Sequence, residues 1–235
     1  SGGTNYFLGR RRKVIPYLQP FQELLEQNAN AENAEAMKAY MKGRFEFYGI
    51  KSPERRELQK QFLAEYGLPK PFDADVFLSL WKADQREYQM FGLDLLRRQA
   101  KKVEQDDLGL IEKLIITKSW WDSVDGLASW VCGPYFQKFS EQTRPITDGW
   151  AISDNMWLRR TSILFQLGYK EKTDSQILAD HILKNLGSNE FFVNKAIGWA
   201  LREYGKTNPD FVKEFVSEHE SQMHPLSIRE ATRNL

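Results

Sequence analysis

The 235-residue sequence has one cysteine, three histidines and no long run of apolar residues. The single Cys132 excludes an intrachain disulfide, which fits a reducing compartment. Because no run of about 18 apolar residues occurs, we expect neither a transmembrane helix nor a secretory signal. The net charge of only +1 excludes a strongly basic, histone-like binder. It does not exclude nucleic acid, because binding depends on where the charges lie.

The scarcity of histidine and cysteine also bears on catalysis. His181, His219 and His224 lack the spacing to acidic residues or to Cys132 that metal ligands show. We therefore expect no metal site and place each histidine on the surface or in a loop. Cys132 has no histidine nearby in sequence to activate it as a nucleophile, and we expect a small packed residue.

Helix start and stop signals recur along the whole chain. Ser52-Pro53-Glu54 and Asn208-Pro209 each place a capping residue before a proline, while Gly67, Gly187 and Gly205 fall where helices should end. These signals predict an all-α protein of short helices paired as a solenoid. With no linker composition in sight, we expect a single domain over residues 1–235, with residues 1–20 as an N-terminal extension or helix.

A weak internal repeat has a period of about 35 residues. Long polar side chains recur at Gln89, Asp125, Arg160 and Lys195, in steps of 36, 35 and 35 residues. The apolar residues around Asp125 match the other three segments poorly. The period is nevertheless in the range of helical repeats.

The segment Thr117–Asp125, TKSWWDSVD, contains two adjacent tryptophans and two aspartates. Ser119 reads as an N-cap and Asp122 as its capping-box partner, which is a structural role. The core face of this helix would carry Trp120, Val124, Leu127 and Val131. Trp121 and Asp125 share another face, and Gly126 lets a partner approach. From the residues alone, Asp125 is either a solvated carboxylate beside a half-exposed tryptophan or a functional group.

Three further segments combine cations with tryptophan or with a helix start. One predicted helix has a face with Lys195, Trp199, Arg202 and Lys206, beside a core stripe of Val193, Ile197, Ala200 and Tyr204. The other two segments supply Trp157, Arg159 and Arg160, and Ser52 with Arg56. Cations with an interleaved indole suit a polyanion such as nucleic acid. The alternatives are a solvated charged face and local pairing with Glu54 or Glu57.

Five segments together resemble the AlkD-type DNA glycosylases, the HEAT-repeat enzymes that repair alkylated purines. The segments are AYMKGRF at 39–45, GIKSPERR at 49–56, TKSWWDSVD at 117–125, SDNMWLRR at 153–160 and KAIGWALREYGKTNP at 195–209. They lie in the expected order and cover nearly the whole chain.

The resemblance implies a curved stack of HEAT-like antiparallel helix pairs with a concave groove for duplex DNA. It implies base excision repair by hydrolysis of the N-glycosidic bond of N3- and N7-alkylated purines, such as 3-methyladenine and 7-methylguanine, without metal or cofactor. The family's catalytic aspartate matches Asp125, its sugar-facing tryptophans Trp121 and Trp199, and its groove arginine Arg160. A groove tyrosine matches Tyr40.

The expected partner is double-stranded DNA containing alkylated purines, and we expect a cytoplasmic, DNA-associated monomer with no membrane contact. The N-terminal stretch up to about Pro20 is longer than the resemblance to the family core requires, and its Arg10–Lys13 cluster either contacts phosphates or is a solvated tail. Among its cations, Asp125 should keep a low pKa and stay ionised.

Two other functions stay open on the sequence. One is a non-catalytic HEAT-type scaffold that binds a protein, and the other is a DNA-binding relative without cleavage. The presence of both Asp125 and Trp121 argues against each of them.

Overall fold

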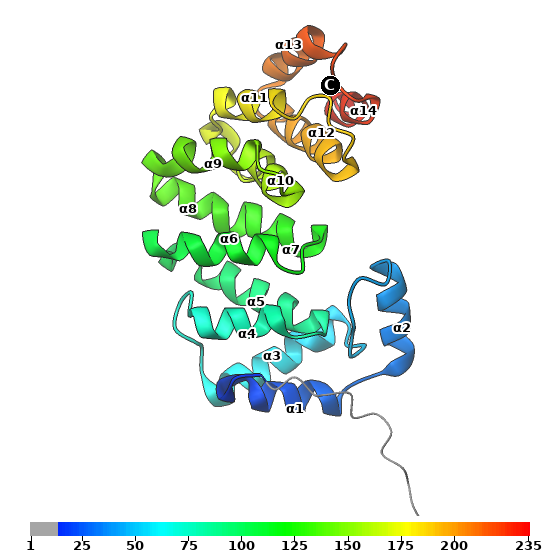
Figure 1. Cartoon of the computed structure of the whole chain (residues 1–235), viewed down its shortest axis with the longest axis vertical. Coiled ribbons are helices and arrows are strands. Elements are labelled where there is room, and N and C mark those ends of the chain that lie inside the picture. Colours follow the sequence, from blue (N-terminus) through cyan, green and yellow to red (C-terminus); the bar gives the residue numbers. More distant parts are fainter. Residues whose placement is uncertain (1–13) are drawn as a thin grey trace, which may run out of the picture. The chain divides into compact units, whose positions relative to one another are not determined.

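The computed structural model describes residues 14–235, and within that range it contains α-helices, short 3-10 turns and a π-helical segment, Leu127–Cys132, but no β-strand (Figure 1). The helices are α1 Gln19–Gln27, α2 Ala31–Tyr40, α3 Ser52–Tyr66, α4 Ala74–Lys82, α5 Arg86–Gln99, α6 Leu108–Ile116, α7 Trp121–Gly126, α8 Gly133–Lys138, α9 Thr143–Ala151, α10 Met156–Leu164, α11 Ser175–Leu183, α12 Phe191–Gly205, α13 Pro209–His219 and α14 Pro225–Thr232. The all-α prediction is confirmed. Among the described residues, none of these helices has the length and apolar character needed to cross a membrane.

The helices form two compact units, and the boundary between them falls within α5, after Leu95. The prediction of a single domain therefore remains a prediction. The Arg10–Lys13 cluster lies outside the described residues.

The first unit has an aromatic core on α1, α3 and α5. Phe21 of α1 is fully buried, with its ring centroid 4.4 Å from that of Phe91 and 5.3 Å from that of Phe62. Leu18, just before α1, is also fully buried. Part of the stretch expected to extend beyond the core, up to about Pro20, therefore belongs to the core itself.

In the second unit, successive helices pack on their neighbours in chain order, as in an α-solenoid (Figure 1). Helix α10 contacts α9, α11 and α12, and α12 in turn contacts α13 and α14. Helices α12 and α14 lie very close together at Gly198, where an added Cβ would lie 2.6 Å from the Cβ of Glu230 on α14. Only glycine therefore allows α14 to dock this closely on α12.

The predicted helix signals are largely confirmed at the residue level. Asn208 caps α13 by accepting a hydrogen bond from the backbone N–H of Phe211 at 3.1 Å. Gly67 ends α3 with a positive φ of 78°. The start of α3 differs by one residue, because Lys51 is the N-cap and Ser52 is already helical.

One pair of repeat positions meets in space, and a third repeat position meets a residue one further period along the chain. Asp125 pairs with Arg160, and Lys195 pairs with Glu230, each across 35 residues of sequence. Gln89 plays a different role, since its amide donates to the carbonyls of Leu80 and Ala83 at the end of α4. The 35-residue period thus brings side chains of successive repeats into contact in the second unit.

Candidate active site

The centre of the site is a bidentate ion pair between Asp125 of α7 and Arg160 of α10. Arg160 Nε donates to Asp125 Oδ1 at 2.8 Å, and Arg160 Nη2 donates to Asp125 Oδ2 at 2.9 Å. The Arg160 side chain is 4% exposed, whereas that of Asp125 is 19% exposed. The carboxylate is therefore reachable from solvent while the arginine behind it is not. A planar guanidinium that binds both oxygens fixes the orientation of the carboxylate.

A third hydrogen bond anchors the arginine from behind. Arg160 Nη1 donates to the backbone carbonyl of Phe192 at 2.5 Å. The Phe192 ring lies 5.0 Å from that of Trp157 and 4.9 Å from that of Trp120, and these three residues form an aromatic cluster. Sequence reasoning missed Phe192, although the adjacent Phe191-Phe192 pair ahead of a predicted helix was an available signal.

The local start of α7 differs from the prediction. Trp120 is the N-cap and makes no side-chain capping bond, so the predicted capping box of Ser119 and Asp122 is wrong. The Ser119 hydroxyl instead donates to the carbonyl of Ile115 at the end of α6. The predicted core face is confirmed at Val124, Leu127 and Val131, all fully buried.

Both predicted sugar-facing tryptophans are half-buried. Trp121 is the first residue of α7, one turn before Asp125, and Trp199 lies on α12 directly after Gly198. Trp199 packs against the apolar core of the second unit with part of its surface. Each indole keeps an exposed portion that a ligand can contact.

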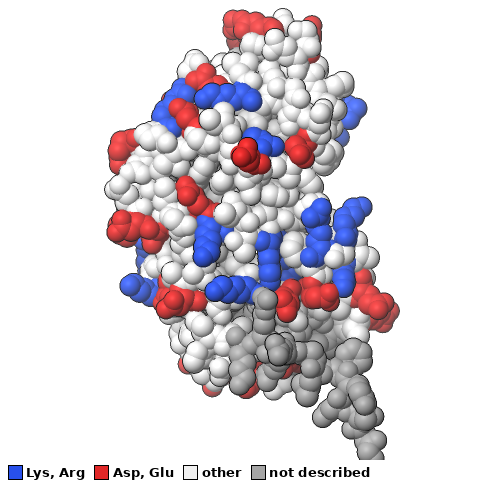
Figure 2. Space-filling view, in the orientation of Figure 1, with Lys and Arg blue, Asp and Glu red and all other residues white. Residues whose placement is uncertain are grey.

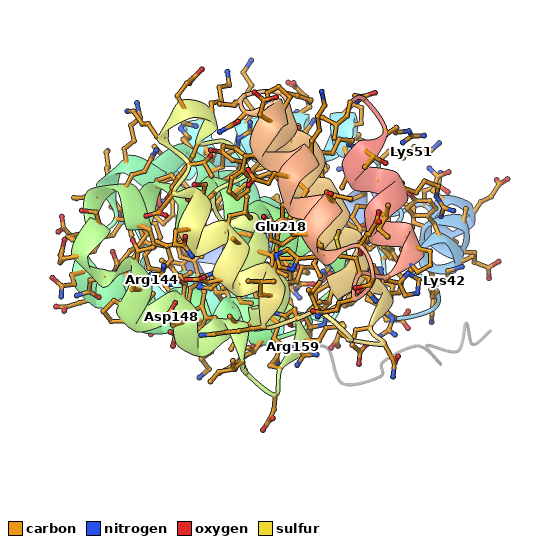
Figure 3. The ribbon with its side chains drawn as sticks, turned by 90° about the horizontal axis from the view of Figure 1, so that it is seen from above. Lys42, Lys51, Arg144, Asp148, Arg159 and Glu218 are labelled. Carbon is orange, nitrogen blue, oxygen red and sulfur yellow. The ribbon has the colours of Figure 1, made fainter. Side chains whose placement is uncertain are left out.

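Arg160 was expected to bind DNA phosphates, and its contacts indicate another role. Its guanidinium is bound to Asp125 and Phe192 and is nearly inaccessible. It therefore positions Asp125 rather than reaching outward. Arg159 donates to the backbone carbonyls of Ser153 at 2.7 Å and Asp154 at 3.2 Å, which braces the turn before α10 (Figure 3).

The predicted cationic face of α12 is already paired with carboxylates. Lys195 Nζ and Arg202 Nη1 each lie 2.9 Å from an oxygen of Glu230, and Lys206 pairs with Glu203 at 2.8 Å. The hydrogen bond from Lys195 is the main cause that lowers the pKa of Glu230. Figure 2 shows cations and carboxylates near one another on the visible face, in keeping with the low net charge. Phosphates would have to compete with these pairs.

The first unit carries the other predicted DNA contacts. Tyr40 ends α2 and is 71% exposed, and Ser52 is exposed in the first turn of α3. The Arg56 side chain is 65% exposed, with its Nε 3.8 Å from Asp94 Oδ2. Its neighbour Arg55 is buried and donates to Asp94 at 3.0 Å. Tyr40, Ser52 and Arg56 are thus accessible to a ligand.

The expected low pKa of Asp125 is wrong. Burial raises the pKa of the Asp125 carboxyl above its ordinary value of 3.8. The hydrogen bonds and charge of Arg160 lower this pKa, but they offset the cost of burial only in part. The result is a carboxylate that ionises less readily than a surface aspartate.

The expectation of a surface position for His181 is also wrong. His181 of α11 is fully buried, and its ring nitrogens lie 2.9 Å from the carbonyl oxygen of Ser162 and 3.0 Å from Asp148 Oδ1. Asp148 in turn lies 3.4 Å from Arg144 (Figure 3). This network ties α9, α10 and α11 together. Within residues 14–235, no three His, Cys, Asp or Glu side chains converge as metal ligands would.

Comparison with known proteins identifies the family of this chain. The DNA alkylation repair enzyme family matches residues 21–235. A solved structure from Enterococcus faecalis, described as a predicted DNA alkylation repair enzyme, is 35% identical, with a TM-score of 0.80 over 88% of this chain and 96% of that chain. A search of curated proteins gives no significant match. The family match spans nearly all of the described residues, so this chain belongs to the DNA alkylation repair enzyme family.

Proposed function

We propose that this protein is a DNA glycosylase that releases N3- and N7-alkylated purines from duplex DNA. The observation that carries the proposal is the Asp125 carboxylate, oriented by a buried arginine and left partly open to solvent. Family membership supports DNA alkylation repair, and the exposed Tyr40, Ser52 and Arg56 supply groups for the duplex.

For this reaction the protein needs to supply mainly a negative charge near the deoxyribose and a correctly placed water. An alkylated purine carries a positive charge, so it leaves without a proton from a general acid. As the bond from C1′ to the purine nitrogen breaks, its electron pair neutralises the purine and positive charge develops on the deoxyribose, as in glycosidases. Water then bonds to C1′ and gives up a proton, which the Asp125 carboxylate accepts and passes to solvent. The products are the neutral free base and an abasic site.

Each residue of the site has a role in this reaction. The Asp125 carboxylate stabilises the sugar cation and orients the water, since each oxygen bound to Arg160 keeps a further lone pair. The faces of Trp121 and Trp199 favour the same cation through their quadrupoles. Arg160 positions Asp125 from behind. The proposed contacts to DNA remain Tyr40, Ser52, Arg56, Trp157, Arg159, Lys195, Arg202 and Lys206.

The direct test is single-turnover release of 7-methylguanine from a duplex oligonucleotide by the intact protein. We expect release well above the spontaneous rate, and duplex binding that weakens as salt rises, because phosphate contacts displace counterions. Binding without release of any alkylated purine would point to a non-catalytic DNA-binding protein. Affinity independent of salt would contradict the predicted DNA contacts.

The rate should fall on the acidic side because only ionised Asp125 stabilises the sugar cation. Burial raises the pKa of Asp125, so the rate should begin to fall at a higher pH than an ordinary aspartate with a pKa of 3.8 would allow. The measurement is the single-turnover rate as a function of pH, with the rate of spontaneous depurination subtracted. A rate that stays constant down to pH 4 would contradict the requirement for ionised Asp125.

A further inference from the structure

Helix α2 projects from the first unit without a core face of its own. None of its ten residues, AENAEAMKAY, is buried. A helix this short gains little from propensity alone, and helices in proteins are held mainly by an apolar face. Its residues Asn33, Ala34, Met37 and Lys38 are only half-buried, so the position of α2 depends strongly on its contacts with the neighbouring loop.

Both ends of α2 are attached to the loop of residues 45–50. At the N-terminal end, the backbone N–H of Asn30 donates to the carbonyl of Tyr48 at 2.8 Å. Gly49 has a φ of +91°, and an added Cβ would lie 2.0 Å from the carbonyl oxygen of Asn30. At the C-terminal end, Lys38 Nζ pairs with Glu46 Oε1 at 2.6 Å. The loop therefore determines where α2 lies.

The loop is fixed in turn by one buried carboxylate on α5. Glu87 is 2% exposed and accepts hydrogen bonds from the backbone N–H groups of Tyr48, Gly49 and Ile50, at 3.0, 2.9 and 3.1 Å. Two more contacts hold the loop against the start of α5. The Arg86 N–H donates to the Glu46 carbonyl at 2.9 Å, and the Arg86 guanidinium lies 3.7 Å from the centroid of the Phe45 ring.

We propose that Glu87 is a positioning residue that holds α2 in place for duplex binding. The inference rests on the proposed function, because it assumes that exposed Tyr40 at the end of α2 contacts DNA. Lys42 and Arg44 follow Tyr40 and are exposed, and Figure 3 shows Lys42 beside the pale-blue ribbon of α2. The same loop leads directly into Lys51 and Ser52 at the start of α3. One carboxylate thus sets the place of two predicted DNA-binding segments.

The direction of the change in DNA affinity distinguishes a positioning role of Glu87 from an effect of its charge. Replacing Glu87 with glutamine removes a negative charge, which by itself favours binding to DNA. A glutamine also has a single acceptor oxygen, so it cannot serve three N–H donors as the carboxylate does. Weaker binding by Glu87→Gln would therefore arise from the lost position of the loop and not from the altered charge.

The experiment compares Glu87→Gln with Glu35→Gln, which makes the same charge change at an exposed position of α2. We expect faster amide hydrogen exchange at Tyr48, Gly49 and Ile50 in Glu87→Gln alone. We expect its Kd for an undamaged duplex to rise about tenfold, equivalent to about 1.4 kcal/mol. Glu35→Gln should bind at least as tightly as the intact protein. Glu87→Asp is a second variant in case Glu87→Gln folds poorly. It keeps the charge on a shorter side chain, and its Kd should be higher than that of the intact protein and lower than the value expected for Glu87→Gln.

A double-mutant cycle with Tyr40→Ala distinguishes positioning from general destabilisation. If Glu87 acts through α2, Glu87→Gln should weaken binding much less in a Tyr40→Ala background than in the intact protein. Fully multiplicative losses, or unchanged exchange at the three amides, would overturn the proposal. Duplex binding is measured without chemistry, so absence of base release would contradict the proposed function and leave this inference intact.

Discussion

Replacing Asp125 with asparagine should lower the single-turnover rate of 7-methylguanine release by about 10²–10³-fold, the usual effect of removing one electrostatic stabiliser of a transition state. Asparagine keeps the size of the side chain and one acceptor oxygen for Arg160, but it carries no charge to oppose the developing sugar cation. Duplex affinity should change little, because the proposed DNA contacts lie on other residues. The measurement is the single-turnover rate at saturating protein, together with the Kd of the duplex.

The matched control for this variant is Asp122→Asn, the same change three residues earlier on α7. We expect it to keep the rate within about threefold, because half-buried Asp122 has no role in the proposed mechanism and its charge is the smallest of the causes that shift the pKa of Asp125. If Asp125→Asn releases the base as fast as the intact protein, the carboxylate is not the stabilising group. If both variants lose activity equally, the cause is the net charge or stability of α7.

The sequence predicts those parts of the fold that depend on local chemistry. Asn208 caps α13 and Gly67 ends α3 as expected, because a capping side chain or a positive φ needs no distant partner. The predicted N-cap role of Ser119 is wrong because a second local partner is available. Its hydroxyl has a competing acceptor in Ile115, four residues back, and spacing alone cannot tell which partner is used.

The site could be predicted as a set of residues but not as a set of contacts. Asp125, Trp121, Arg160 and Trp199 are all visible in motifs. The pairing of Asp125 with Arg160 depends on how two helices pack, and the 35-residue period only hinted at it. Glu230 escaped notice for the same reason, since it meets Lys195 and Arg202 from a different helix.

Burial is the quantity that the sequence conceals most. Counting nearby cations predicted a low pKa for Asp125, whereas removal from water raises it. The same omission placed His181 on the surface, although it is fully buried between α9, α10 and α11. Both errors arise because the cost of desolvation depends on tertiary packing and leaves no trace in residue spacing.

Replacing Arg160 with methionine should lower the free energy of unfolding by about 3 kcal/mol at neutral pH, because a largely but not fully buried carboxylate would lose its partner. Methionine fills much of the same volume, so the loss comes mainly from charge and hydrogen bonds. Arg160→Lys should lose less, since it keeps the charge but cannot bind both oxygens. Arg159→Met is the matched control, because Arg159 donates to backbone carbonyls and to no carboxylate in the described contacts. Urea denaturation of the three variants and the intact protein gives the values.

The pH dependence of this loss decides whether Arg160 stabilises a charge or fills space. Arg160 lowers the pKa of Asp125, so without it the folded-state pKa should rise further above the ordinary value. A carboxyl with a raised folded pKa binds its proton more tightly when folded, so stability falls as pH rises through that range. The deficit of Arg160→Met should therefore be small at acidic pH, where Asp125 is protonated, and should grow toward neutral pH. A deficit that is equal at all pH values would mean that Arg160 contributes only packing and its hydrogen bond to the Phe192 carbonyl. The proposed role of Arg160 in orienting an ionised Asp125 would then be contradicted.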